Sequence, residues 1–572
     1  MGRLTRKGFL EEVIATQTGG MKQSPAKPDT IFTTYANKTL PKAYKTTSYL
    51  NQYTGAWNEQ VVRHLLRRTM FGIRPADVQA MLAMNMSDAV DYLLNNIPAL
   101  PLPPVNNYSA NGTADITGVP AGQTWVTAPV GDGTLNDTRR YSYKAWWFGQ
   151  ALNQNLSIIE KMVFFWHNHF ATQTYIVGDA RMSYNHNVLL RTNALGNYKT
   201  FVKAVSKDCA MLMYLNGSQN TKNNPDENYG RELQELFTVG KYNTPNYTED
   251  DVKAASRVLT GWQVNNTTLS SFFIPAEHDT TDKQFSSFYN NTVIKGLSGA
   301  DGASETDALI DMIFTKMETA HYLCTKLYRF FIYYNITADI DANVITPLAQ
   351  LLVDNNFEIK PVLQCLLKSE HFYDVNNIGC YIKTPLDFLA GTFRTFNITI
   401  SPTLSANQTY AFWNYLVGYG GKLGLDLGDP PNVAGWQPFY ESPAYYEIWI
   451  NSSTFPLRME FTDMMLSSGF NAGTGTTLSI DIPGFTQQYA DAADPDMLVD
   501  YFASLFSGID ISPGEHDNLK NILLSGQTSN AYWTAAWEDY IANPNTENTS
   551  IIYSRLSSLL TTMLRLPEHQ LC

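Results

Sequence analysis

The sequence has few charged residues, few cysteines and no long hydrophobic run. Charged residues make up 16% of its 572 residues, against about 25% in an average soluble domain. The remaining balance is acidic, with a net charge of −13, and no run of Lys and Arg interrupts it. Proteins that bind the phosphate backbone of a nucleic acid present a broad positively charged surface. The acidic composition therefore disfavours a nucleic-acid-binding protein.

The five cysteines are scattered, and none belongs to a Cys-x-x-Cys pair. A disulfide framework and a zinc knuckle both require a different pattern. Free, buried thiols are therefore expected.

No stretch of 18 apolar residues is present, so the sequence predicts no membrane span. The first residues have a basic start, but Glu11 and Glu12 interrupt the apolar stretch that a signal peptide needs. A signal peptide is not expected. The low charge content nevertheless leaves an extracytoplasmic role open.

The usual catalytic signatures are also missing. The sequence has no Gly-x-Ser-x-Gly elbow, no phosphate-binding loop, no His-Glu-x-x-His zinc motif and no dinucleotide-binding fingerprint. Assignment of a reaction therefore depends on less specific arrangements of residues.

Aromatic residues are abundant, with 33 Tyr, 29 Phe and 11 Trp, and 44% of the chain is hydrophobic. Such a chain can bury a large core. Helical periodicity recurs along most of it, including a long helix from about Tyr141, while residues 97–135 read as a loop and 263–300 as a hairpin region. We predict a mainly α, large multi-helix globular fold with long irregular loops and at most short β-hairpins.

The segment FFWHNHFATQ carries His167 and His169 two positions apart. Residues with this spacing point to opposite sides of an ideal helix, so the imidazoles converge only where a helix ends. Imidazole suits metal ligation and proton transfer, which makes both histidines candidate metal ligands. The alternative is a pair of hydrogen-bonded histidines in an aromatic core.

The segment NYGRELQELFTVG places Glu232 and Glu235 on one helix face. Two carboxylates beside the histidines would serve as ligands or as acid and base. The alternative is an ion-pair network with Arg231 that orients neighbouring helices.

His278 and Asp279 follow in a less helical stretch, and both are candidates, His278 as a metal ligand and Asp279 as a catalytic or orienting group. A local turn is the alternative. Five further histidines lie in segments with helical periodicity and are expected to be structural or exposed: His64, His186, His321, His371 and His569. The rigid loop DPPNVAGW, 429–436, is expected to clamp Trp436 into the core.

These segments, in this order, resemble the bacterial family of domain of unknown function 1800. The resemblance covers roughly residues 57–461 and rests on RHLLRRTMFG, FFWHNHFAT, LLRTNALGNY, AMLMYLNG, NYGRELQELFTVG, YTEDDVKAASRVLTGW, CTKLYRFFI, KTPLDFLAGTFRTF, PPNVAGW and WINSSTFPLRMEF. Residues 1–55 are polar, rich in Lys and Thr, and aperiodic, so we expect an N-terminal arm there. The resemblance implies a helical family core over 56–461, and we expect a helical C-terminal extension over 462–572 that packs on the core.

The resemblance transfers no catalytic residue, because the family has no assigned activity. It implies envelope or exported proteins that often accompany a sulfatase-like family, and hence a protein partner from that family. The sequence leaves two hypotheses open. The first is a hydrolase-like enzyme, assisted by a divalent metal, that acts on envelope or carbohydrate material. The second is a non-catalytic helical scaffold of an envelope or secretion assembly.

Overall fold

The computed structural model describes residues 49–109, 112, 114–241, 247–436 and 445–572. Helices dominate this part of the chain, and its strands form two separate two-stranded antiparallel sheets. The predicted mainly α fold with short β-hairpins is therefore confirmed. Residues 1–48 of the expected polar arm lie outside the described residues.

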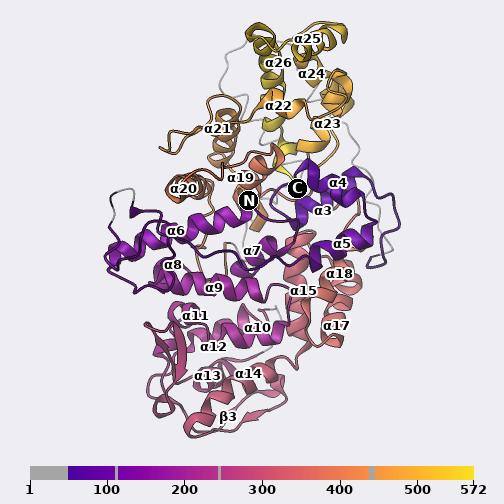
Figure 1. Cartoon of the computed structure of the whole chain (residues 1–572). Helices are drawn as coiled ribbons and strands as arrows, with labels where there is room; N and C mark the ends of the chain where they lie inside the picture. The colour runs from indigo at the N-terminus through magenta and orange to yellow at the C-terminus, as the bar shows by residue number, and fades with distance from the viewer. Residues whose placement is uncertain (1–48, 110–111, 113, 242–246, 437–444) are drawn as a thin grey trace.

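The N-terminal half of the described chain builds the middle of the molecule in Figure 1 and continues into its lower end, where α12 and α13 lie. Its α-helices are α3 (Glu59–Thr69), α4 (Pro75–Leu82), α5 (Met86–Asn95), α6 (Gly133–Leu152), α7 (Ile159–His169), α8 (Thr174–Val177), α9 (Ala180–Thr192), α10 (Tyr198–Val205), α11 (Cys209–Tyr214), α12 (Glu227–Glu235) and α13 (Glu249–Val258). The long helix α6 begins before the expected Tyr141, because the Asp132 side chain accepts a hydrogen bond from the amide of Leu135 and caps the helix earlier.

The short strands lie at one end of the molecule, beside α13 and α14 (Figure 1). The strand β1 (Trp262–Asn265) pairs with β2 (Ser270–Phe273), with Trp262 opposite Phe273, and β3 (Lys283–Gln284) pairs with β4 (Val293–Ile294). Both sheets fall within the stretch that the sequence marks as a hairpin region, with Trp262 just before it.

The C-terminal half returns to helices. Its α-helices are α14 (Glu305–Ile313), α15 (Met317–Phe331), α16 (Ala338–Ile340), α17 (Thr346–Asp354), α18 (Ile359–Leu367), α19 (Pro385–Thr395), α20 (Ala406–Lys422), α21 (Thr454–Leu466), α22 (Ile482–Thr486), α23 (Pro495–Phe506), α24 (Pro513–Leu523), α25 (Ala531–Ala542) and α26 (Thr546–Arg565). Short 3-10 and π turns lie between or after helices and strands along the whole described chain: η2 (Gly217–Gln219), η3 (Pro275–Glu277), η4 (Ser287–Tyr289), η5 (Gly299–Ser304), η6 (Asp341–Ile345), η7 (Tyr445–Trp449) and η8 (Pro567–Gln570).

Helix α26 is the centre of the C-terminal bundle, where it packs against α21, α22, α24 and α25 (Figure 1). After it, the chain turns back to the core. Leu571 forms a β-bridge with Ile382, and the amide of Lys383 donates to Gln570 O at 2.8 Å. The last residues therefore lie against the start of α19.

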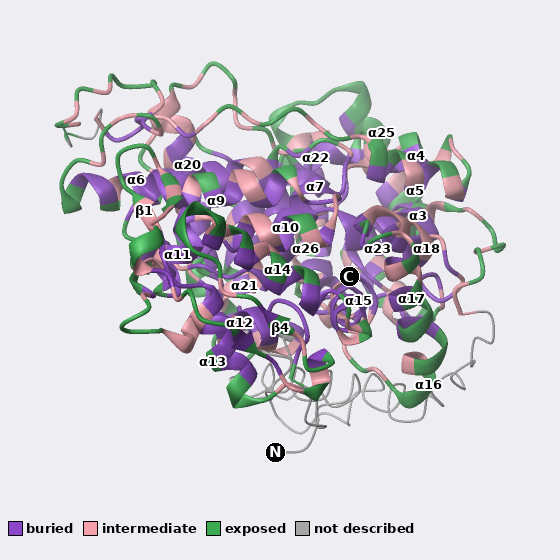
Figure 2. Cartoon of the chain, turned by 90° about the horizontal axis from the view of Figure 1, so that it is seen from below, coloured by how far each residue is buried: buried purple, intermediate pink, exposed green. Residues whose placement is uncertain are grey.

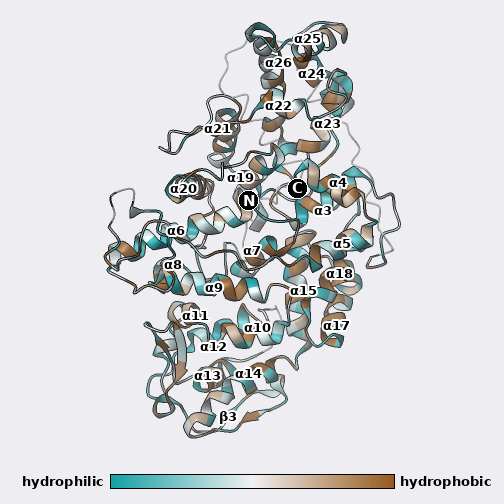
Figure 3. Cartoon of the chain, in the orientation of Figure 1, coloured by the Kyte–Doolittle hydropathy of each residue, from teal (hydrophilic) through white to brown (hydrophobic). Residues whose placement is uncertain are grey.

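Buried residues run through the central helices, whereas exposed ones lie on the outer turns and loops (Figure 2). Most helices carry both hydrophobic and hydrophilic residues (Figure 3), which is the pattern of a helix with one face on a core. An aromatic cluster around α7 joins Trp166 to Phe170, Tyr198 and Phe201. None of the five cysteines forms a disulfide, as the sequence predicts; Cys209, Cys324 and Cys572 are buried as expected, whereas Cys365 and Cys380 are half-buried. None of the described helices is both long and apolar enough to cross a bilayer.

Candidate active site

The end of α7 positions the two histidines of the FFWHNHF segment. Nearly every residue of this helix is buried, and it ends where the amide of Phe170 donates to Trp166 O at 2.7 Å. Because His167 and His169 are two positions apart, their side chains leave the helix in different directions. The two rings consequently have different neighbours.

His167 lies in an aromatic environment. Its ring packs against Trp147 at a centroid distance of 4.8 Å, Trp436 at 6.0 Å and His186 at 6.5 Å. Its Nδ1 atom is buried and has no hydrogen-bond partner among the described residues. Burial and the neighbouring His186 lower the pKa of His167 to about 3, so the ring is neutral near pH 7.

His169 has hydrogen-bond partners at both ring nitrogens. Its Nε2 atom lies 3.2 Å from Tyr198 Oη and 3.2 Å from Phe237 O, and Lys326 Nζ lies 3.1 Å from Nδ1. Burial and the Lys326 charge hold the pKa of His169 well below its usual range. The lysine donor assigns the free lone pair to Nδ1 and the proton to Nε2.

Lys326 is a residue that the sequence reading missed. Burial and Arg329 lower the pKa of its ammonium to about 7. It lies in CTKLYRFFI, far from the histidines in the chain, and its surroundings are visible only in the folded structure. Its contact with His169 favours a hydrogen-bonded network that fixes α7 against α15.

Glu232 and Glu235 lie one turn apart on α12, as the sequence predicts, but their environments differ. Glu235 pairs with Lys241 at 3.1 Å and accepts a hydrogen bond from Tyr247 Oη at 3.5 Å. The Glu232 carboxyl is half-buried and forms no hydrogen bond with any described residue. Burial, followed by the charge of Glu235, raises the pKa of Glu232 to about 7.

Tyr214 connects the Glu232 carboxyl electrostatically with a second acidic group. Burial, followed by the charges of Asp429 and Glu232, raises the pKa of Tyr214 to about 12. Asp429 is held by Lys144 at 2.6 Å and by the Thr174 hydroxyl at 2.9 Å. Sequence reading missed Lys144 and Tyr214 because nothing in a helical pattern distinguishes them from core residues.

Asp429 opens the DPPNVAGW loop, whose end packs against α7. The amide of Trp436 donates to Asn168 Oδ1 at 2.9 Å, and Trp436 is buried. Gly435 has a φ of 93°, and a Cβ atom there would lie 2.1 Å from Asn168 Oδ1. The loop therefore clamps Trp436 into the core, in agreement with the expectation from the sequence.

His278 and Asp279 lie in another cluster, beside α13 and α14. The Nε2 atom of His278 lies 2.9 Å from Glu305 Oε1, and Nδ1 lies 2.9 Å from Thr260 O. Lys283 also pairs with Glu305, at 2.5 Å. Asp279 pairs with Arg257 at 2.7 Å. These partners are all different from those of His167 and His169, so the contacts do not bring the three predicted metal ligands together.

The described residues do not fit a divalent metal at the predicted ligands. No three His, Cys, Asp or Glu side chains in this part of the chain are grouped so that they could hold an ion. His169 and His278 also have hydrogen-bond partners at both nitrogens. A ligand set for zinc needs at least three converging donors, so we derive no step through a metal.

A family model described as "Protein of unknown function (DUF1800)" matches residues 64–571, which is most of the chain. No curated protein and no solved structure matches it at a significant level.

Proposed function

The chain belongs to the DUF1800 family, and from this premise we propose that it is a hydrolase-like enzyme in which Glu232 carries the proton transfer. One observation supports this most directly. Glu232 is a half-buried carboxyl without a described hydrogen-bond partner, and its pKa is raised to about 7. A general acid or base is most effective when its pKa lies near the working pH.

The charged and titratable groups around Glu232 support this role. Glu235 raises the pKa of Glu232, whereas Arg231 and Lys241 lower it. Arg231 is already paired with Glu227 at 3.1 Å and Glu249 at 2.7 Å. Lys241 pairs with Glu235 at 3.1 Å. Both cations therefore serve other carboxylates and only partly offset the effect of burial, so the carboxyl can alternate between acid and base near neutral pH.

The substrate class that we propose is envelope or carbohydrate material. Tyr247 interacts electrostatically with Glu232 and is half-buried, whereas Tyr214, which also interacts with Glu232, is buried in the core. Tyrosine offers an apolar ring face and a hydroxyl, a combination that suits sugar rings. Glu232 would protonate a leaving oxygen or remove a proton from an attacking water, as paired carboxylates do in glycoside hydrolysis.

The test compares Glu232→Gln with the matched control Glu227→Gln on the same helix. Both would be assayed for release of reducing ends from cell-wall polysaccharide and from aryl glycosides. We expect Glu232→Gln to lower kcat about 10²- to 10⁴-fold, the usual contribution of a general acid or base, with little change in KM. Glu227→Gln should retain the activity of the unmodified protein. Equal activity in both variants, on a substrate that the protein cleaves, would rule Glu232 out.

A second function, a non-catalytic scaffold, is favoured by the histidine contacts. His169 and His278 are buried and hydrogen-bonded at both nitrogens, which is the pattern of residues that fix helix packing. In this alternative the protein binds an envelope partner, and the sulfatase-like partner rests on the family resemblance alone. Hydrolysis that depends on Glu232 would contradict it.

A further inference from the structure

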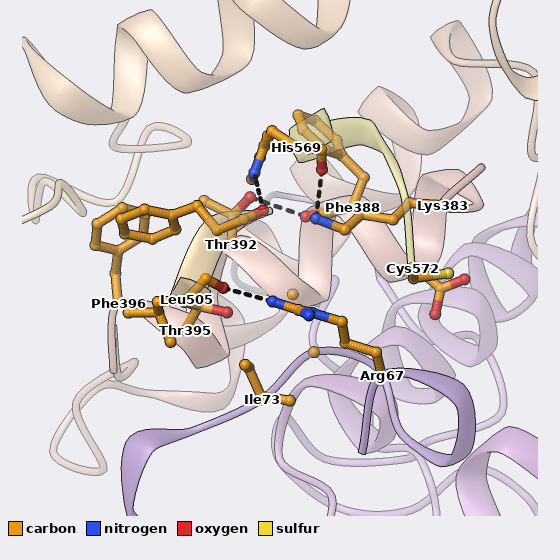
Figure 4. A pocket seen from close by; sticks show the side chains of 14 residues that line it. Arg67, Ile73, Lys383, Phe388, Thr392, Thr395, Phe396, Leu505, His569 and Cys572 are labelled. Carbon is orange, nitrogen blue, oxygen red and sulfur yellow. Dashed lines mark hydrogen bonds between the residues drawn. The ribbon is translucent and has the colours of Figure 1, made fainter. Parts of the chain in front are cut away.

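A cavity of about 30 Å³ lies between α3, α19 and the C-terminal residues. Arg67, Lys383, Thr392 and His569 are among the residues on its wall (Figure 4). Its volume corresponds to about two water molecules. Such a space admits a small ion and excludes a sugar or a nucleotide.

Two basic side chains on the wall are paired with backbone carbonyl groups. Lys383 Nζ donates to His569 O at 2.5 Å, and Arg67 donates to Ser504 O and Leu505 O, each at 3.0 Å. Neither side chain has a described carboxylate as an ion-pair partner. Figure 4 shows them reaching the cavity from different elements. A carbonyl oxygen does not neutralise a cation. Cys572 acts as a negative charge on both groups and Asp387 acts as one on Lys383, but neither forms a direct ion pair with Arg67 or Lys383.

Asp387, the carboxylate on the same wall, is committed to other partners. One oxygen pairs with Lys161, and the other accepts the Thr384 hydroxyl at 2.8 Å and the Thr384 amide at 3.2 Å. These bonds form the capping box at the start of α19. Asp387 is therefore not free to turn toward Lys383 or Arg67.

His569 adds an unpaired nitrogen. Its Nδ1 atom lies 3.0 Å from Phe506 O, whereas Nε2 is buried and has no described partner. Burial and then the charge of Arg67 lower the pKa of Lys383 to about 7, and burial and Lys383 depress the pKa of His569. Arg458 adds to the same positive potential at both groups. An anion in the cavity would reverse these unfavourable interactions.

We propose that this cavity binds a small oxyanion of the phosphate and sulfate class. Lys383 and Arg67 supply the charge, and His569 Nε2 supplies a further donor when the ring is protonated. The bound anion would join α3 and α19 to the C-terminal residues. The proposal involves neither Glu232 nor its neighbours, so it is independent of the proposed enzymatic activity.

The direct test is equilibrium dialysis of radiolabelled inorganic phosphate against the unmodified, full-length protein. We expect saturable binding of one phosphate per chain, displaced by sulfate but not by chloride at the same ionic strength. Absence of saturable binding at millimolar phosphate would overturn the proposal. Displacement by chloride at equal concentration would also overturn it, because it would identify a halide site.

A variant pair locates the site. Lys383→Met keeps the apolar stem and removes the charge, and should weaken phosphate binding at least tenfold. Lys253→Met, which removes an exposed lysine paired with Asp250, is the matched control and should bind phosphate as the unmodified protein does. If Lys383→Met does not fold, His569→Phe in the same assay takes its place. Unchanged phosphate affinity in a folded variant of either residue would place the anion elsewhere and contradict the proposal.

Discussion

Glu232 and Glu305 are glutamates in two different regions of the molecule. Their environments shift their pKa values in opposite directions. At Glu305 burial raises the pKa, but hydrogen bonds from His278 and Lys283 and from the amide of Leu297 outweigh it and the pKa falls below its usual value. At Glu232 burial acts with no described donor to oppose it, and the pKa rises to about 7. Burial alone therefore does not mark a functional carboxyl; the number of donors around it decides.

Among the variants that test this comparison, the one that removes the Glu305 charge should have the largest effect on the free energy of unfolding. Lys283 has no exposed side-chain surface and depends on Glu305 for its counter-charge. We expect Glu305→Gln to lower the free energy of unfolding by about 3–5 kcal/mol, the usual result of breaking a buried pair. Urea denaturation at pH 7 measures it. Asp301→Asn, an exposed control nearby, should change stability by less than about 0.5 kcal/mol. Equal effects of the two variants would show that the Glu305 cluster is not structural.

The pH dependence of Glu232 should have the opposite sign to that of Glu305. The fold raises the pKa of Glu232, so its contribution to stability is complete below about pH 4.5 and is lost as the pH rises through about 7. Glu232→Gln should therefore be more stable than the unmodified protein at pH 8, by about 1 kcal/mol after allowance for solvent screening. The two should converge at pH 4.5. Denaturation curves between pH 4.5 and 8 measure this, and parallel curves would contradict the raised pKa.

Lys241 offers the smallest and most selective change. Its pair with Glu235 is solvent-exposed on the lysine side, so Lys241→Ala should alter the free energy of unfolding by no more than about 0.5 kcal/mol. Lys241 also lowers the pKa of Glu232. In the Lys241→Ala variant the contribution of Glu232 to stability should therefore be lost at a higher pH than in the unmodified protein. A downward shift of that transition would show that Lys241 acts on Glu232 in another way.

The local rules of the sequence were sufficient for most of the fold. Thr248 and Asp251, three positions apart, form a capping box at the start of α13, and the non-helical stretch after α13 contains the two short hairpins. The predicted start of α6, at about Tyr141, was wrong. The cap at Asp132 extends the helix into a segment whose sequence is typical of a loop. The RELQELF segment indicated Glu232, on which the proposed function rests, whereas the histidines of the WHNHF segment have other partners.

The sequence by itself determined the helices, the hairpins, the acidic net charge, the family and the short set of titratable residues, because these follow from composition and from patterns within a few residues. Tertiary structure alone decided their partners. His169 meets Lys326 across 157 positions and His278 meets Glu305 across 27, whereas Glu232 is left without a described donor. The donors that shift a pKa come from distant segments, and their arrival depends on how whole helices pack.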